Sequence, residues 1–218
     1  MSRPVIVVVG AGPGVSGSVA RRFADEGYDV ALLGQDQEVL DQLAADLETR
    51  GATVGHACVD VTDEQATRDA VRRFGEHTGR IDVLHFNPSA FREEDPLTLT
   101  VAGLLEDVAL GVGALLTVVQ AARPHMSRGG RISVTGSMAA DEPWERAASL
   151  GVQKAGVRNL VHSIDKTLAD EGIRAVSVTV RGSLAREGAF TPARVADAIW
   201  DAVATVDADW RSEVPYSG

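Results

Sequence analysis

This chain has one cysteine, few aromatic residues and no cluster of basic residues. Cys58 is the only cysteine among 218 residues, which excludes intramolecular disulfides and a zinc site built from several thiolates, and favours a reducing cytoplasm. Acidic residues outnumber basic ones by 31 to 21, so the chain offers no electrostatic footprint for nucleic acid or an anionic membrane. We therefore expect neither of these partners, and no metal.

Long hydrophobic segments are also missing. The longest, 109–122, is interrupted by Gln120 and flanked by charged residues, which leaves it short of the roughly 20 residues of a membrane-spanning helix. The run 5–9 is too short for the apolar region of a signal peptide, and it continues into a glycine-rich loop rather than a cleavage site. We expect a buried helix at 109–122, no export, and a cytoplasmic protein.

Apolar runs alternate regularly with amphipathic segments along most of the chain. The runs are continuous, which is typical of strands buried on both faces of a parallel sheet, and the crossovers then place helices on both sides. We expect a single α/β domain over 1–218, with a Rossmann-like, doubly wound, mainly parallel sheet. Strands are predicted at 5–9, 29–33, 53–59, 82–86, 131–135, 174–180 and 210–216, and helices after the first strand and at 38–50, 63–77, 97–126, 149–171 and 192–205.

A glycine-rich turn lies between the first strand and the first helix. Gly10 suits the sharp turn, and Gly12 and Gly14 would let backbone N–H groups approach a pyrophosphate at the helix N-terminus. A tight turn without a ligand is the alternative. The surrounding β/α repeat favours nucleotide binding, because a glycine fingerprint has meaning only between a strand and a helix.

This order of features resembles the short-chain dehydrogenase/reductase family along essentially the whole chain. The turn resembles that family's three-glycine loop, with Gly10 and Gly14 as the first two glycines and Ser16 in place of the third, unless Gly17 takes that role. The resemblance implies a dinucleotide-binding protein that acts on a small-molecule substrate.

The resemblance also implies contacts to the rest of the dinucleotide. Asp60, followed by Val61, matches the acidic residue that contacts the adenine amino group, and a helix cap or turn is its alternative role. Asn87 is the residue retained from the family's Asn-Asn-Ala-Gly loop. We expect its side chain to hold that loop by hydrogen bonds to backbone, as asparagines do in turns.

The active-site positions match only in part. Ser137 matches the family's catalytic serine and Lys154 its lysine, but Leu150 stands where the tyrosine is expected and Gly111 where the asparagine is expected. Leu150 and Lys154 are four residues apart and therefore share one helix face, so the spacing of the family's site is kept although its proton donor is lost. A positioned general acid is worth roughly 10²–10⁴ in rate, so a slow carbonyl reductase is expected unless another donor substitutes.

Several residues are candidates for that donor or for the remaining site roles. Lys154 would donate to the nicotinamide ribose, or instead extend to solvent from its helix; Ser137 would bond a substrate oxygen, or instead cap a loop. The only tyrosines, Tyr28 and Tyr216, lie far away in sequence. Replacement donors to be examined are Asp141, Glu142, His85 and His162, each with a bland alternative as a surface group or cap.

The sequence leaves open whether the cofactor is NADP or NAD. Gln35 stands where an NADP-type arginine usually lies, Asp36 is one place beyond it, and Pro13 adds no charge. The segment after the sixth strand has Arg181 in place of the family's proline, and only about ten residues, 181–191, precede the next helix. Such a short loop implies an open cleft, a bulky substrate, or none.

Three functions fit these residues. The leading hypothesis is an NAD(P)-dependent oxidoreductase of a carbonyl or alcohol with an atypical site. A nucleotide-binding pseudoenzyme that regulates a partner is the second, and a non-redox isomerase or cyclase that uses the same pocket is the third. The resemblance also implies a homodimer or homotetramer, paired through the helices near 97–126 and 149–171.

Overall fold

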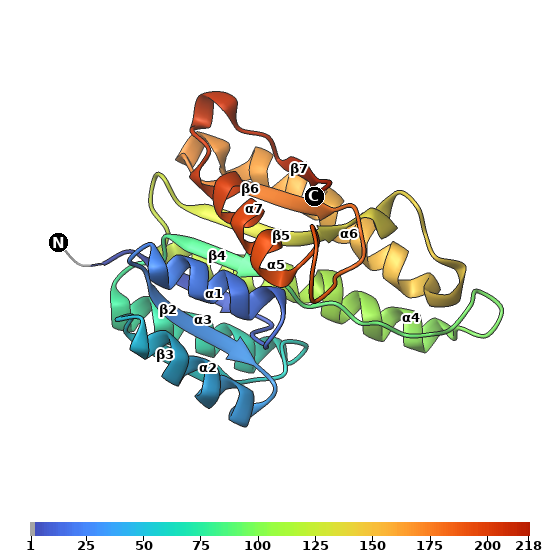
Figure 1. The fold of residues 1–218 in the computed structure, drawn as a ribbon, viewed down its shortest axis with the longest axis horizontal. Coiled ribbons are helices and arrows are strands. Elements are labelled where there is room, and N and C mark those ends of the chain that lie inside the picture. The colour runs from blue at the N-terminus through green and yellow to red at the C-terminus, as the bar shows by residue number, and fades with distance from the viewer. Residues whose placement is uncertain (1–2) are drawn as a thin grey trace.

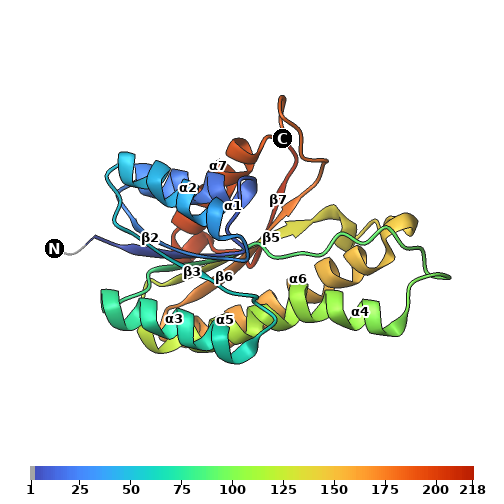
Figure 2. The same cartoon turned by 90° about the horizontal axis from the view of Figure 1, so that it is seen from below.

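A computed structural model describes residues 3–218. Seven parallel strands form one sheet in the order β3-β2-β1-β4-β5-β6-β7. Helices α1, α2 and α7 cover one face and α3, α4, α5 and α6 cover the other (Figures 1 and 2). This arrangement confirms the doubly wound, Rossmann-like fold. The strands are β1 Val5–Val9, β2 Asp29–Gly34, β3 Val54–Cys58, β4 Val83–Phe86, β5 Arg131–Ser137, β6 Arg174–Val180 and β7 Glu213–Tyr216. The helices are α1 Val15–Asp25, α2 Gln37–Thr49, α3 Glu64–Thr78, α4 Val101–Val108, α5 Ala114–Ala122, α6 Ala148–Leu168 and α7 Pro192–Ala204.

The sheet carries apolar side chains on both faces because strands such as β1, β2, β4 and β6 contribute to two cores. In β1, Val7 and Val9 face the core under α3, α5 and α6, while Ile6 and Val8 face the core under α1, α2 and α7. All five residues of this strand are buried. The continuous apolar runs that predicted the strands are therefore the direct result of burial on both sides.

Three predicted boundaries were wrong. The helix expected at 97–126 begins at Val101, where the Thr100 side chain accepts from the Gly103 N–H, and it contains a π-helical turn, Ala109–Gly113, between α4 and α5. The last strand covers only Glu213–Tyr216: a 3₁₀ turn occupies Asp207–Asp209, and 210–212 form a connection rather than part of the strand. Strand β5 continues two residues further than expected, to Ser137.

The helical stretch Val101–His125 is the one segment among residues 3–218 that is long and apolar enough to cross a membrane. A core helix of a soluble protein passes the same test, and one such helix is weak support for a membrane span. In this fold Leu115, Val118 and Ala122 of α5 are fully buried in the core under the sheet. The burial predicted for 109–122 therefore holds for the sheet-facing side of the helix.

Candidate active site

The glycine turn places an open helix N-terminus at the carboxyl edge of the sheet. Gly10 has φ +75°, a conformation that other residues rarely adopt, and the Pro88 ring lies where a side chain at position 10 would be. Helix α1 begins after Gly14 with no side-chain cap. Its first N–H groups therefore remain available, and together with the helix dipole they suit a phosphate.

The close approach within this turn occurs at Gly17. A Cβ at position 17 would overlap the Gly12 carbonyl oxygen, so only glycine fits there. Ser16 is buried, and its Oγ accepts a hydrogen bond from the Gly12 N–H at 3.0 Å. The serine thus closes the turn with its hydroxyl, and Gly17 supplies the room that the resemblance assigned to a third glycine.

A cavity of about 390 Å³ lies beside the turn, between β1, β2 and the loop after β4. The Gln35 and Asp36 side chains at its rim are exposed, and Asp36 caps α2 by accepting from the Val39 N–H at 3.1 Å. No lysine or arginine lines the cavity as the structure describes it. The full lining consists of Gly10, Ala11, Gly12, Pro13, Gly34, Gln35, Asp36, Val39, Val61, Pro88, Ser89 and Leu110.

Asp60 follows β3 near this cavity. Its Oδ1 accepts from the Thr62 hydroxyl at 2.7 Å and from the Thr62 N–H at 2.9 Å. These bonds, with a smaller contribution from the Gln35 side chain, hold the pKa of the Asp60 carboxyl below its usual range. The carboxylate is ionised at neutral pH and is presented at the surface next to Val61, which lines the cavity.

Asn87 lies at the end of β4, as expected, but the bond that ties it to β1 uses its backbone. The Asn87 N–H donates to the Val9 carbonyl at 3.0 Å. The loop that follows is held by Gln153 of α6, which the sequence analysis did not identify: its Oε1 accepts from the Ala90 N–H at 2.9 Å. A side chain from another element therefore fixes the loop that we expected Asn87 to fix.

Lys154 reaches from α6 to the carboxyl end of β5, where Ser137 lies. The residue is 7% exposed, and its ammonium donates to the Thr135 carbonyl at 2.9 Å, two residues before Ser137. It does not extend to solvent, so that alternative was wrong. Burial lowers the pKa of Lys154 to about 8. The Ser137 Oγ accepts from the Ala139 N–H at 3.2 Å, which caps the short helix after β5 and leaves its own proton free to bond a ligand.

Leu150 lies on the first turns of α6, one turn before Lys154, and is partly buried. Gly111 lies in the π-helical turn, where a Cβ would overlap Oε1 of Gln153. Neither tyrosine substitutes for a donor at position 150. Tyr28 packs edge-to-face on Phe23, and the Tyr216 hydroxyl donates to the Ala189 carbonyl at 2.6 Å.

Of the four replacement donors, the structure excludes His85. Its ring is fully buried in β4, where burial lowers its pKa to about 3, and its nitrogens contact the Ser133 and Thr135 hydroxyls. A neutral ring inside the sheet does not deliver protons to an edge site. Asp141 pairs with Arg158 and Arg181, and the Arg158 hydrogen bond in particular holds its pKa below the usual range, so it is an ion rather than an acid at neutral pH.

The other two candidates, Glu142 and His162, are not placed to act as the proton donor. Glu142 is exposed next to Asp141. His162 is two turns beyond Lys154 on α6, with Nδ1 2.7 Å from the Ser212 Oγ and Nε2 3.8 Å from the Glu213 carboxylate. That pairing gives His162 a structural role at the β7 side of the sheet.

The short segment 181–191 is anchored on the C-terminal strand. The Tyr216 hydroxyl donates to the Ala189 carbonyl, and Phe190 packs edge-to-face on Tyr216 with ring centres 5.7 Å apart. Arg181, in the position of the family's proline, pairs with Asp141 at 3.0 Å and so joins the end of β6 to the segment after β5.

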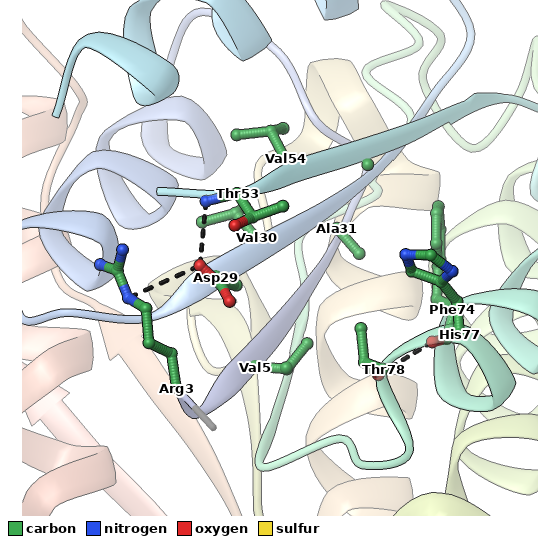
Figure 3. A pocket seen from close by; sticks show the side chains of 11 residues that line it. Arg3, Val5, Asp29, Val30, Ala31, Thr53, Val54, Phe74, His77 and Thr78 are labelled. Carbon is green, nitrogen blue, oxygen red and sulfur yellow. Dashed lines mark hydrogen bonds and ion pairs between the residues drawn. The ribbon is translucent and has the colours of Figure 1, made fainter. Parts of the chain in front are cut away.

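Among the cavities that lie away from the glycine turn, two have largely apolar linings. One of about 250 Å³ opens at the opposite, amino-terminal edge of the sheet, where Arg3 and Asp29 pair near Thr53 and face His77 across a largely apolar interior (Figure 3). In a parallel α/β sheet ligands bind at the carboxyl ends of the strands, so this cavity belongs to packing. The other, of about 520 Å³, lies between the first turns of α4 and α6 and is lined mainly by apolar residues.

A buried carboxylate paired with a half-exposed arginine was also missed by the sequence analysis. Asp107 is 3% exposed; it accepts two bonds from the Arg92 guanidinium, both 3.0 Å, and one from the Ser149 hydroxyl at 2.6 Å. Arg92 lies in the loop after β4 and Ser149 immediately precedes Leu150. The one local signal was an acidic residue inside an apolar helical stretch, which by itself does not name its partners.

Comparison with known proteins yields one consistent family. The sequence profile of the short chain dehydrogenase family matches residues 4–184. An oxidoreductase of Sarocladium schorii is 31% identical over 83% of this chain and 72% of that protein. Sulfoacetaldehyde reductase 2 of Chromohalobacter salexigens is 28% identical over 80% of this chain and 70% of its own. A short-chain dehydrogenase of Burkholderia cenocepacia, solved in complex with NADP, superimposes with a TM-score of 0.91 at 25% identity, covering 99% of this chain and 96% of the other.

Proposed function

Because this chain belongs to the short-chain dehydrogenase family, we propose that it is an NAD(P)-dependent oxidoreductase that acts on a carbonyl or alcohol through an atypical active site. The observation that carries the proposal is the pairing of an uncapped α1 N-terminus and its 390 Å³ cavity with a buried lysine at the end of β5. Bound nicotinamide would supply or accept the hydride. The α1 N–H groups would bind the pyrophosphate, and Asp60 and Val61 would hold the adenine.

In this proposal the substrate oxygen lies near Ser137 and Lys154. The Ser137 hydroxyl donates a hydrogen bond to it, and the Lys154 ammonium adds positive potential where negative charge develops. Leu150 has no proton to donate, so the proton comes from solvent. The expected result is slow turnover, because a positioned acid is worth roughly 10²–10⁴ in rate.

We further propose that the enzyme prefers NAD(H). A 2′-phosphate carries negative charge, and the rim of the cavity offers it the Asp36 carboxylate and the neutral Gln35 amide, with no lysine or arginine in the described lining. A 2′-hydroxyl, in contrast, suits an acidic neighbour. The NADP found in the related Burkholderia structure is the competing expectation.

Titration of the purified protein with NADH and NADPH, followed by fluorescence and thermal shift, tests both statements. Tighter binding of NADH than of NADPH supports both proposals. Gln35→Arg is then expected to improve NADPH binding about tenfold, because the new guanidinium would pair with the 2′-phosphate. Gln42→Arg, at an exposed position on α2, the helix that follows Gln35, controls for added charge alone. Absence of binding by either nucleotide at millimolar concentration would remove the oxidoreductase proposal.

Binding without turnover supports the second candidate, a nucleotide-binding regulator. The observation in its favour is Leu150, because this residue leaves the proposed site without a proton donor on the first turns of α6. A panel of carbonyl compounds with NADH, assayed by the loss of nicotinamide absorbance, separates the two.

We propose that two copies pair through the outer faces of α4, α5 and α6. Apolar side chains are exposed there, with Val101 at 75%, Leu105 at 61% and Val152 at 49%. Covering such a patch stabilises an assembly. Light scattering after size-exclusion chromatography is expected to show a dimer or tetramer that Leu105→Glu dissociates. The single cysteine supports a cytoplasmic place for this assembly.

A further inference from the structure

Gln153 is a fully buried amide on α6, and each of its polar atoms contacts backbone. Its Oε1 accepts from the Ala90 N–H at 2.9 Å, while its Nε2 donates to the Ala90 carbonyl at 3.3 Å and to the Ser149 carbonyl at 3.2 Å. The side chain therefore pairs with both backbone groups of one loop residue, as a neighbouring strand would. A loop residue held in this way has little freedom to move away from α6.

The same side chain fills the space beside Gly111. A Cβ at position 111 would overlap the Gln153 Oε1 and lie 3.0 Å from its Cγ. Gly111 belongs to the π-helical turn, a feature that often re-aims helix residues at functional sites. Glycine at position 111 is thus what admits the Gln153 amide to its place.

Both segments that Gln153 contacts form walls of the dinucleotide cavity. Pro88 and Ser89 line it immediately before Ala90, and Leu110 lines it immediately before Gly111. Pro88 also lies against Gly10 of the glycine turn. One buried amide of α6 therefore contacts two cavity walls, which lie at separate places in the crossover between β4 and β5.

We propose that Gln153 is a positioning residue for dinucleotide binding, and that Gly111 and Gln153 act as a coupled pair. This inference rests on the proposed function. Without the amide, the loop after β4 must be ordered at the moment of binding, and ordering a segment weakens affinity. We expect about a tenfold loss of NADH affinity when the contact is removed.

The test uses two variants that break the same contact from opposite sides. Gln153→Met keeps the length of the side chain without its hydrogen bonds, and Gly111→Ala displaces the amide without changing α6. Gly113→Ala is the matched control, because a Cβ there lies 3.9 Å from its nearest neighbour, the Val108 carbonyl oxygen. The measurements are the Kd for NADH and the hydrogen exchange of the Ala90 amide.

We expect Gln153→Met and Gly111→Ala each to raise the Kd at least fivefold and to speed Ala90 exchange at least tenfold, with Gly113→Ala changing neither. The double variant Gly111→Ala/Gln153→Ala is expected to bind NADH no more weakly than Gln153→Ala alone, because the new methyl group enters the space that the amide left. Such non-additivity is not expected from two independent structural defects.

The proposal is overturned if Gly111→Ala behaves like Gly113→Ala, or if Ala90 exchange stays slow in Gln153→Met. Wild-type binding of NADH with unchanged affinity in every variant overturns the positioning role and leaves the proposed function intact. A wild-type protein that binds neither NADH nor NADPH removes the proposed function first, and the positioning role with it. If one variant fails to fold, the other still tests the same contact.

Discussion

Replacing Lys154 by methionine is expected to make the protein more stable at neutral pH while weakening dinucleotide binding. Lys154 is one of only two lysines in the chain, and its ammonium is buried with one hydrogen bond, to the Thr135 carbonyl. Burial lowers its pKa from 10.5 to about 8 because the charged form is removed from water. Methionine fills a similar volume without a charge to desolvate.

The size of the effect follows from the two pKa values. A tenfold change in a proton equilibrium is about 1.4 kcal/mol, so the drop from 10.5 to about 8 corresponds to about 3 kcal/mol of destabilisation while the amine is charged in both states. Loss of the hydrogen bond to Thr135 offsets about 1 kcal/mol. The net expectation is a Lys154→Met protein about 2 kcal/mol more stable than the wild type at pH 7.

The two pKa values also determine how the stability difference between the wild type and Lys154→Met changes with pH. Below pH 8 both folded and unfolded chains carry the Lys154 proton, so the full penalty is present. Between pH 8 and 10.5 the unfolded chain keeps the proton and the folded chain releases it, so wild-type stability rises with pH relative to Lys154→Met. Above pH 10.5 the penalty is gone and the two proteins differ only by the hydrogen bond.

Urea denaturation of both proteins at pH 7, 9 and 10.5 measures this difference. Lys166→Met, at an exposed position on the same helix, is the matched control and is expected to change little at any pH. A difference between wild type and Lys154→Met that does not vary with pH would refute the desolvation argument. A Lys154→Met protein less stable than the wild type at pH 7 would do the same.

Three further predictions concern neighbouring groups. Asp107→Ala leaves the buried Ser149 hydroxyl without its acceptor and removes two hydrogen bonds from Arg92, which keeps Glu106 as a partner, so it is expected to lower the free energy of unfolding by about 1–3 kcal/mol, measured by urea denaturation. Leu150→Tyr places a proton donor one turn from Lys154 and is expected to raise carbonyl reduction by NADH by about 10²–10⁴, measured by nicotinamide absorbance. His85 stays neutral in the folded state down to about pH 3, so between pH 6.5 and 3 only the unfolded chain binds a proton at this position and the wild type loses stability as the pH falls. From pH 7 to 4, His85→Asn is therefore expected to lose about 3 kcal/mol less than the wild type, measured by urea denaturation.

Each of these has an outcome that contradicts it. A loss below 1 kcal/mol in Asp107→Ala would mean that Arg92 and Ser149 find other partners or water. A Leu150→Tyr protein that folds and binds NADH but remains inactive would show that more than a proton donor is missing. Parallel acid denaturation of wild type and His85→Asn would mean that water reaches the ring.

Local sequence features predicted the fold and the frame of the site. Continuous apolar runs such as Val5–Val9 identify strands buried on both faces, and the glycine turn after the first strand marks the α1 N-terminus, because both depend on residues that are neighbours in the chain. Ser137 and Lys154 were found through a resemblance that depends on spacing along β5 and α6. These two residues could be selected as candidates without knowing which distant segments of the chain are in contact.

The contacts that hold this frame were decided only by the tertiary structure. Gln153 and Ala90 are 63 residues apart, and Asp107 and Ser149 are 42 apart, so no local pattern announces that they meet. The burial of His85 likewise depends on β5 pairing with β4 and on helices covering both faces of the sheet. The pKa of a polar side chain and its hydrogen-bond partners depend on how much water surrounds it. That amount of water is set by the packing of every helix and strand around the side chain, so it is known only from the tertiary structure.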